Sequence, residues 1–400
     1  MQVNPGFQDL GGPTIQDRHA PRGLGLRRAS VRLGVCLAVL IAAELWVGRA
    51  LPAPDYERAF RLPLASPTAS LYDFVRHIEH APPTASPKIA FLGASPTYGY
   101  RVKDARSTWP EAFEAAARRA GTSVRAYNVA CNGQFLGDEA VVAERLASKA
   151  GVLYIQLTYH TFNPRARSGR ALRFAELPRL LAVSPPADEA RALGLAQDAV
   201  APLSASVDRT LRDAWALYRE REAIDKRLFG GTPRGVLQAL ASGRKPARPD
   251  SASDTFDDGF TSFDSLDPAQ QMVVVARYAE DASFALTAED SQVRLLGALA
   301  RSLKRRGVKA VFYMSPLNRD LIDAWELIDA PQYRRNVGLL QGAVTASGFP
   351  FIDYNTGPRR FGGELFADVS HTTDAGAQAV GRALFADTRR YLVSLKGAAR

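Results

Sequence analysis

Five short apolar runs alternate with helix-forming segments between residues 88 and 353, and this alternation constrains the fold more than any other feature of the chain. Runs of this length, bounded by small and turn-forming residues, are typical of buried strands. Parallel strands need crossover connections, which the intervening helices supply. The pattern therefore predicts a doubly wound α/β domain with a five-stranded parallel sheet. The predicted strands span residues 88–94, 124–130, 152–158, 308–313 and 350–353, and the helices between them span 112–120, 138–150, 292–306 and 333–346.

The alternation stops between the third and fourth strands. Residues 205–229 have the pattern of a charged helix, whereas residues 243–265 are rich in Ser, Asp, Gly and Pro and have no period. Long segments without a period inside a domain are usually binding loops, lids or disordered stretches. We predict that residues 171–290 form an insertion that is mostly helical, with a disordered acidic loop at about 243–265. The α/β domain then comprises residues 88–170 and 291–400.

The N-terminal part carries an apolar run over residues 33–48, interrupted only by Glu44. A helix that crosses a bilayer needs roughly 20 apolar residues, so this run is short, and Trp46 would lie at the interface. Five arginines precede it, and positive flanks stay in the cytoplasm. A cleaved signal peptide and a buried core helix are the alternatives. We predict a basic cytoplasmic tail (1–32), an inner-membrane anchor (33–50) and a linker (51–87) that can contain a short helix around residues 71–80, with the rest of the chain in the periplasm or its equivalent.

Composition excludes several classes of protein. The chain of 400 residues is 46% apolar and 23% charged, which is ordinary globular usage. Its net charge of +10 comes from 43 Arg and only eight Lys, without any motif of a nucleic-acid-binding fold, so no nucleic-acid partner is expected. The two cysteines, Cys36 and Cys131, cannot make a four-ligand zinc site. Neither a metal nor a cofactor is predicted.

Three residues have the types and positions of a serine-catalysis site. Ser95 follows the first predicted strand, and ligands of parallel sheets bind beyond the carboxyl ends of the strands. Asp368 and His371 lie three residues apart, just before the last predicted helix. An aspartate in this position can hold an imidazole in the tautomer that takes a proton from a serine. We predict Ser95 as nucleophile, whose own N–H helps to bind an oxyanion, with His371 as general base and Asp368 as its orienting partner.

The order of these motifs resembles the SGNH/GDSL hydrolase superfamily over roughly residues 86–170 and 290–395. The family's Gly-Asp-Ser is similar to Gly93-Ala94-Ser95 here, with Ala94 in place of the Asp, and its last block is similar to Asp368-x-x-His371. Gly133 resembles the family glycine whose N–H lines the oxyanion hole. The family's third block, Gly-x-Asn, is missing. His160 or Asn163 is the candidate for its oxyanion donor.

The resemblance implies a flavodoxin-like, SGNH-type sheet and chemistry through an acyl-serine that needs no cofactor. It also implies either an esterase or an O-acyltransferase that acts on a cell-envelope polysaccharide, as membrane-anchored proteins of this type do beside a multi-spanning O-acyltransferase. Arg165, Arg167 and Arg170 are candidate contacts for the glycan. The alternative is a non-catalytic binding or assembly module of a polysaccharide export complex, which Ala94 and the missing Gly-x-Asn favour.

Overall fold

The computed structural model describes residues 22–50, 61–62, 67–82, 86–165, 170–183, 263–357 and 359–398, with isolated positions between 191 and 219. The chain forms two compact units, Met1–Pro52 and Ala53–Arg400. Arg167 and most of the predicted acidic loop, residues 243–262, lie outside the described residues.

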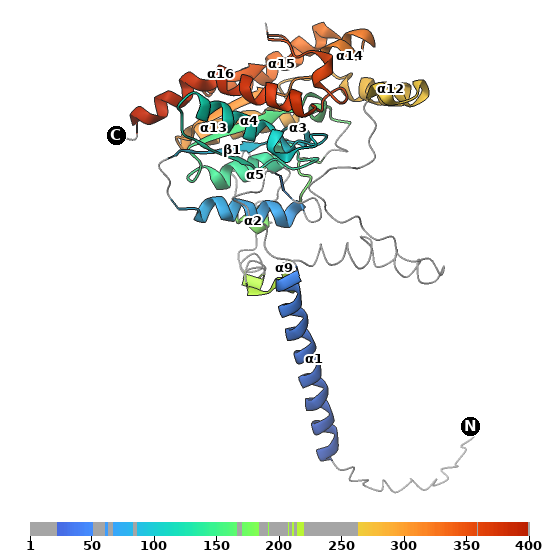
Figure 1. The fold of residues 1–400 in the computed structure, drawn as a ribbon, viewed down its shortest axis with the longest axis vertical. Helices are drawn as coiled ribbons and strands as arrows, with labels where there is room; N and C mark the ends of the chain where they lie inside the picture. Colours follow the sequence, from blue (N-terminus) through green and yellow to red (C-terminus); the bar gives the residue numbers. More distant parts are fainter. Residues whose placement is uncertain are drawn as a thin grey trace, which may run out of the picture. The chain divides into compact units, whose positions relative to one another are not determined.

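A five-stranded sheet that includes β1 forms the centre of the second unit (Figure 1). Its strand order is β2-β1-β3-β4-β5, and every pair is parallel. This is the flavodoxin-like order, so the prediction of a five-stranded parallel sheet is confirmed. Each strand lies within two residues of its predicted bounds at its start and within two at its end. The strands are β1 (Lys88–Leu92), β2 (Arg125–Asn128), β3 (Val152–Leu157), β4 (Ala310–Met314) and β5 (Phe351–Asp353).

Alternate side chains of each strand enter two separate cores. In β1, Ile89 and Phe91 point to one face of the sheet, whereas Ala90 and Leu92 point to the other. The first face is covered by α4 (Trp109–Arg119) and α16 (Asp374–Ala398). The second face is covered by α5 (Leu136–Leu146), α13 (Ser291–Arg305) and α15 (Ala330–Thr345). Burial on both faces explains why the strands read as continuous apolar runs.

Two segments outside the predicted α/β domain belong to the second core. Helix α2 (Pro67–His80), which lies within the predicted linker 51–87, buries Leu71, Phe74 and Ile78 there. Helix α6 (Leu177–Leu181), from the predicted insertion, is buried in the same core. The shorter elements are α3 (Ser95–Tyr98), η1 (Ala105–Ser107), η2 (Tyr159–Phe162), α9 (Ala216–Arg219), η3 (Phe263–Ser265), α12 (Pro268–Ala282), α14 (Arg319–Ala324) and η4 (Gly363–Leu365).

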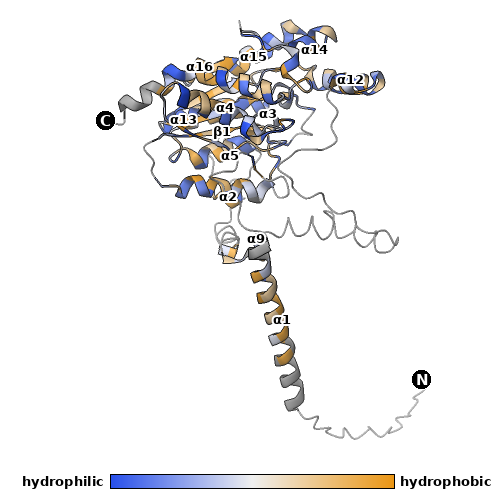
Figure 2. Cartoon of the chain, viewed as in Figure 1, coloured by the Kyte–Doolittle hydropathy of each residue, from blue (hydrophilic) through white to orange (hydrophobic). Residues whose placement is uncertain are grey.

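The first unit contains α1 (Arg22–Ala50), which includes all of the predicted anchor. Its described side chains are mostly apolar and exposed, among them Leu33, Ile41 and Trp46 (Figure 2). None of the helices described is long and apolar enough to cross a membrane. The helix expected over residues 33–50 is present as part of α1.

Close packing between α16 and α4 depends on one glycine. A Cβ added to Gly381 would lie 2.5 Å from the carbonyl oxygen of Trp109 and 2.5 Å from the Cβ of Ala112. Gly338, which is also inside a helix, has nothing within 4 Å of the same added atom. The two glycines therefore offer a matched pair, one at a helix contact and one at an exposed position.

We predict opposite effects of alanine at these two positions. Gly381→Ala should lower the free energy of unfolding by about 1–3 kcal/mol, because the added methyl group forces α16 away from α4. Gly338→Ala should raise it by about 0.5–1 kcal/mol, because alanine loses less conformational freedom in a helix. Urea unfolding of each variant measures both changes. Equal effects in the two variants would contradict this account of the α4–α16 contact.

Candidate active site

The turn after β1 places Ser95 at the carboxyl edge of the sheet, as the first residue of α3. A side chain on Gly93 would collide with the side chain of Gln156 on the neighbouring β3. The Oε1 atom of Gln156 in turn accepts a hydrogen bond from the N–H of Thr97, at 3.2 Å. Thr97 Oγ1 lies 2.8 Å from the hydroxyl of Tyr313 on β4. The turn that carries the serine is thus bound to β3 and β4.

The structure brings Ser95, His371 and Asp368 together in one hydrogen-bonded chain. Ser95 Oγ lies 2.9 Å from His371 Nε2, and His371 Nδ1 lies 2.7 Å from Asp368 Oδ2. Asp368 Oδ1 accepts from the N–H groups of Ser370 and His371, both at 2.8 Å. Burial alone would raise the pKa of Asp368, but the imidazole and these two N–H groups hold it below its ordinary value. The carboxylate therefore stays ionised at neutral pH and holds Nδ1–H toward itself.

Contacts with α4 and η4 hold the segment that carries His371. The indole N–H of Trp109 donates to Thr372 Oγ1 at 3.2 Å, so the first residue of α4 braces the residue after the histidine. Gly376 passes so close to the carbonyl oxygen of Leu365 that no side chain fits there. The aromatic ring of Tyr100 meets the imidazole of His371 edge-on, with 5.1 Å between centroids. Sequence reasoning missed Tyr100, because only the fold places it beside the histidine.

The loop between β2 and α5 brings Gly133 to the same edge of the sheet. The N–H of Cys131 donates to the carbonyl oxygen of Gly93 at 3.1 Å, which ties this loop to the serine turn. Gly133 has a φ of +76°, in the left-handed region that glycine adopts without strain. Gly133 therefore lies in a loop attached to the turn that carries Ser95.

A buried carboxylate connects the Gly133 loop to residues 173–174. The oxygens of Asp138 accept from the N–H groups of Phe135, Arg173 and Phe174 at 2.9, 2.9 and 3.0 Å. Burial raises the pKa of Asp138 to about 6, although these N–H groups oppose the rise. The connection places the side chain of Arg173 beside the loop, since a Cβ on Gly133 would lie 3.8 Å from its Nε.

Arg173, near the start of the predicted insertion, thus lies beside the candidate oxyanion loop. Sequence reasoning proposed Arg165, Arg167 and Arg170 instead. Arg165 and Arg170 are exposed, and Arg167 lies outside the described residues. Asp138 connects the Gly133 loop to Arg173 by accepting a hydrogen bond from the Arg173 N–H. This contact is visible only in the fold, so the sequence alone could not identify Arg173.

Asn163 is turned toward α12 by its hydrogen bonds. Its Nδ2 donates to the carbonyl oxygens of Asp281, at 2.9 Å, and of Glu280, at 3.4 Å. Its Oδ1 accepts from the N–H of Arg165 at 2.9 Å. The side chain is buried and holds the end of α12 against η2. The structure therefore gives Asn163 a positioning role and does not direct its amide to Ser95.

His160 is the remaining candidate for the third donor, and its environment keeps it neutral. Burial is the main cause that lowers its pKa to about 4, and the charge of His371 lowers it further, while Asp281 and Asp368 oppose. His160 lies in η2, directly after the carboxyl end of β3. Its Nδ1 is buried and has no hydrogen-bond partner among the described residues.

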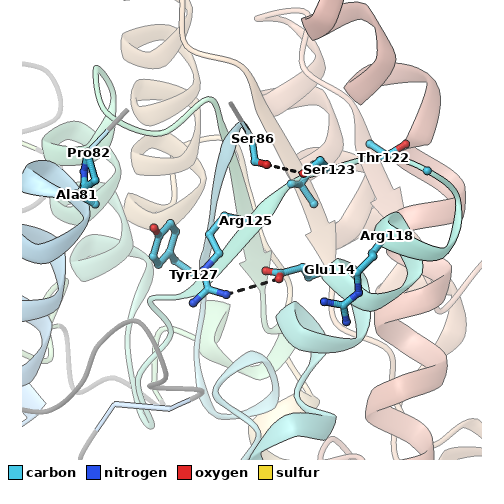
Figure 3. A pocket seen from close by; sticks show the side chains of 11 residues that line it. Ala81, Pro82, Ser86, Glu114, Arg118, Thr122, Ser123, Arg125 and Tyr127 are labelled. Carbon is cyan, nitrogen blue, oxygen red and sulfur yellow. Dashed lines mark hydrogen bonds and ion pairs between the residues drawn. The ribbon is translucent and has the colours of Figure 1, made fainter. Parts of the chain in front are cut away.

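The described residues contain no group of three or more His, Cys, Asp or Glu side chains that could hold a metal ion. A cavity of about 560 Å³ lies at the other end of the strands, between Ser86, which precedes β1, and Arg125, which begins β2 (Figure 3). Arg125 forms an ion pair with Glu114 there, at 3.6 Å. Ser95 follows the opposite end of β1, so this cavity is separate from the serine site.

Comparison with known proteins found no matching family model and no match among curated proteins. Among solved structures, the fold is similar to that of a family two carbohydrate esterase from Clostridium thermocellum, determined in complex with cellohexaose. The two chains are 11% identical, the match covers 78% of this chain and 66% of the other, and the TM-score is 0.29. The match spans just under two thirds of that protein. The function is therefore argued from the site itself.

Proposed function

We propose that this protein is an SGNH-type serine enzyme that cleaves or transfers acyl esters. One observation carries the proposal, namely the chain of hydrogen bonds from Ser95 through His371 to Asp368 at the carboxyl edge of a parallel sheet. A serine with a purely structural role in a turn needs no imidazole on its hydroxyl, and still less one oriented by a buried carboxylate. The same three groups, in these roles, define serine acyl transfer on several unrelated folds.

The first half of the reaction forms an acyl-serine. Ser95 Oγ attacks the ester carbonyl carbon while His371 Nε2 takes its proton, and Asp368 stabilises the imidazolium that results. The N–H groups of Ser95 and Gly133, together with His160, bind the negative oxygen of the tetrahedral intermediate. His371 then returns its proton to the leaving alcohol. In the second half, water or another hydroxyl attacks the acyl-serine by the same route in reverse.

The alternative function is a binding or assembly module that keeps the fold without the chemistry. Ala94 and the absence of Gly-x-Asn favour it. The hydrogen-bonded Ser95 and His371 favour the enzyme, because a binding module has no use for an activated hydroxyl. Reactivity of Ser95 separates the two.

We predict that wild-type protein is labelled by a fluorophosphonate at Ser95 and hydrolyses a short acyl ester. Ser95→Ala and His371→Ala should each reduce hydrolysis at least about 10³-fold, and Asp368→Asn should do so by roughly 10⁴-fold through the wrong tautomer. Mass spectrometry locates the label, and steady-state kinetics measure the rates. Ser86→Ala and His80→Ala are matched controls that should retain activity. An unlabelled Ser95 in folded protein would favour the binding module.

We further propose that the acyl group is exchanged with a hydroxyl of an acidic cell-envelope polysaccharide, in concert with a multi-spanning O-acyltransferase. A transferase must hold its acceptor close to the acyl-serine so that the acceptor reacts before water does. The exposed guanidinium group of Arg173 lies beside the Gly133 loop, where a bound glycan would pass. The proposal therefore assigns glycan binding to Arg173, with Arg165 and Arg170 further along the same segment.

We predict that Arg173→Glu lowers the ratio of transfer to hydrolysis when an acidic polysaccharide is the acceptor. The loss should be largest at low ionic strength, because salt screens exposed charges. The control is Arg305→Glu, because Arg305 ends α13 shortly before β4 begins and so lies near the amino ends of the strands. This variant should leave the ratio of transfer to hydrolysis unchanged. Product analysis with a radiolabelled acyl donor measures both routes. Efficient hydrolysis without transfer to any envelope glycan would leave an esterase.

We also propose that α1 attaches the protein to the inner membrane and that the serine site acts outside the cytoplasm. The exposed apolar side chains of α1 and the five arginines before residue 33 support this placement. A periplasm-active reporter fused after residue 60 should be active, and deletion of residues 1–52 should release the protein from the membrane fraction. Activity only of a cytoplasm-active reporter would contradict the proposed orientation.

A further inference from the structure

Two buried polar atoms on neighbouring rings have no hydrogen-bond partner among the described residues. They are Nδ1 of His160, in η2, and the hydroxyl of Tyr278, in α12. The two rings meet edge to face, with 6.0 Å between centroids and 68° between planes. Buried polar groups without a partner are costly and rare in native proteins, so a pair of them in contact calls for a physical explanation.

The two groups are chemically complementary. A phenol donates one hydrogen bond, and a neutral imidazole has one nitrogen that donates and one that accepts. His160 is neutral, as shown above, and burial also keeps Tyr278 in its phenol form by raising its pKa. The acceptor nitrogen of a neutral histidine is selected by the hydrogen bond that its ring receives.

We propose that one water molecule links the two groups, accepting from the Tyr278 hydroxyl and donating to Nδ1 of His160, and thereby places the proton of His160 on Nε2. This inference rests on the proposed function, because the Nε2–H group is then the donor that His160 offers to the oxyanion. Tyr278 is a positioning residue in this scheme and does not touch the substrate. A glutamine or asparagine amide needs no such partner, since its NH₂ group always donates.

The hydrogen bonds of Asn163 support this role for α12. They attach the last residues of α12 to η2, the element that carries His160. Asp267 and Gln270 cap the other end of α12 with reciprocal hydrogen bonds of 2.9 and 3.3 Å. Tyr278 is thus carried on a helix that is capped at one end and attached to η2 at the other.

The first measurement needs no turnover. Nitrogen NMR of the full chain with labelled histidine, in which the His160 signals are assigned from a His160→Gln sample, reports which ring nitrogen carries the proton. We expect Nε2 to be protonated in the wild type, and Tyr278→Phe to shift the ring toward a mixture of both tautomers. A proton on Nδ1 in the wild type, or an unchanged tautomer in Tyr278→Phe, would overturn the proposal.

The second measurement is a kinetic double-mutant cycle on a short acyl ester. Tyr278→Phe should lower kcat about tenfold with KM unchanged, as the loss of a group that orients another typically does. In a His160→Gln background, Tyr278→Phe should change kcat less than twofold, because the glutamine amide donates without help. Equal losses in both backgrounds would mean that Tyr278 acts through Asp368 or through the fold, and the proposal would be wrong.

A control separates this inference from general loss of a buried hydroxyl and from failure of the proposed function. Tyr354→Phe removes a hydroxyl that donates to Asp387 on α16, at 3.1 Å, and should leave kcat unchanged. Fluorophosphonate labelling of Ser95 in Tyr278→Phe shows that the triad remains assembled. If Ser95→Ala kept full activity, the proposed function would fail, while the tautomer of His160 would still be measured independently.

Discussion

The hydrogen bond between Ser95 and His371 joins residues that are 276 positions apart in the chain. It forms only because the sheet and its loops bring these two residues together. Ser95 follows β1, an interior strand of the sheet, whereas His371 comes after β5, which is an edge strand. Hydrogen bonds between the loops at the carboxyl ends bridge that distance. Asn318 N–H donates to Val369 O at 2.8 Å, and Asn355 Nδ2 donates to Ser315 O at 3.0 Å. The loop with the histidine is thus supported by the loop that follows β4.

Buried polar side chains keep these loops in place, and most of them bind backbone groups. Gln156 holds the serine turn, Asp138 holds the start of α5, and Asn163 holds the end of α12. Each satisfies N–H or carbonyl groups that the ends of strands and helices leave without partners. A catalytic site needs rigid loops, and a parallel sheet supplies only the strand ends. The buried side chains of Gln156 on β3, Asp138 on α5 and Asn163 after η2 therefore fix loops that the sheet alone does not hold.

The sequence was sufficient to predict the sheet, because strands that are buried on both faces consist of short, continuous apolar segments. These segments alternate with helical patterns along this chain. It also predicted that Ser95, Asp368 and His371 belong to one site. The order of these residues along the chain, and the spacing of Asp368 and His371, can be recognised without knowledge of the fold. The sequence indicated a short helix around residues 71–80 but not that α2 packs into the core, because prolines typical of a linker flank the apolar stripe of this helix. Tyr278 was missed, and Arg173 was not singled out among the arginines near it, for a different reason. Nothing local distinguishes them from other exposed arginines or partly buried tyrosines, and only tertiary contacts bring them to the site.

The choice between His160 and Asn163 shows most clearly where sequence reasoning ends. Both side chains can donate a hydrogen bond, and both lie just after β3, so their residue types decide nothing. Which of the two can act as the oxyanion donor depends on the carbonyl oxygens near each side chain. Here Asn163 donates its amide hydrogens to the carbonyl oxygens of Glu280 and Asp281 in α12. The amide of an asparagine can always donate a hydrogen bond to an oxyanion. The neutral imidazole of His160 can donate only if its proton is on the nitrogen that faces the oxyanion, so its tautomer must be selected. The helix that engages the amide also brings the hydroxyl of Tyr278 to the imidazole, so the insertion and the chemistry of the site are parts of one arrangement.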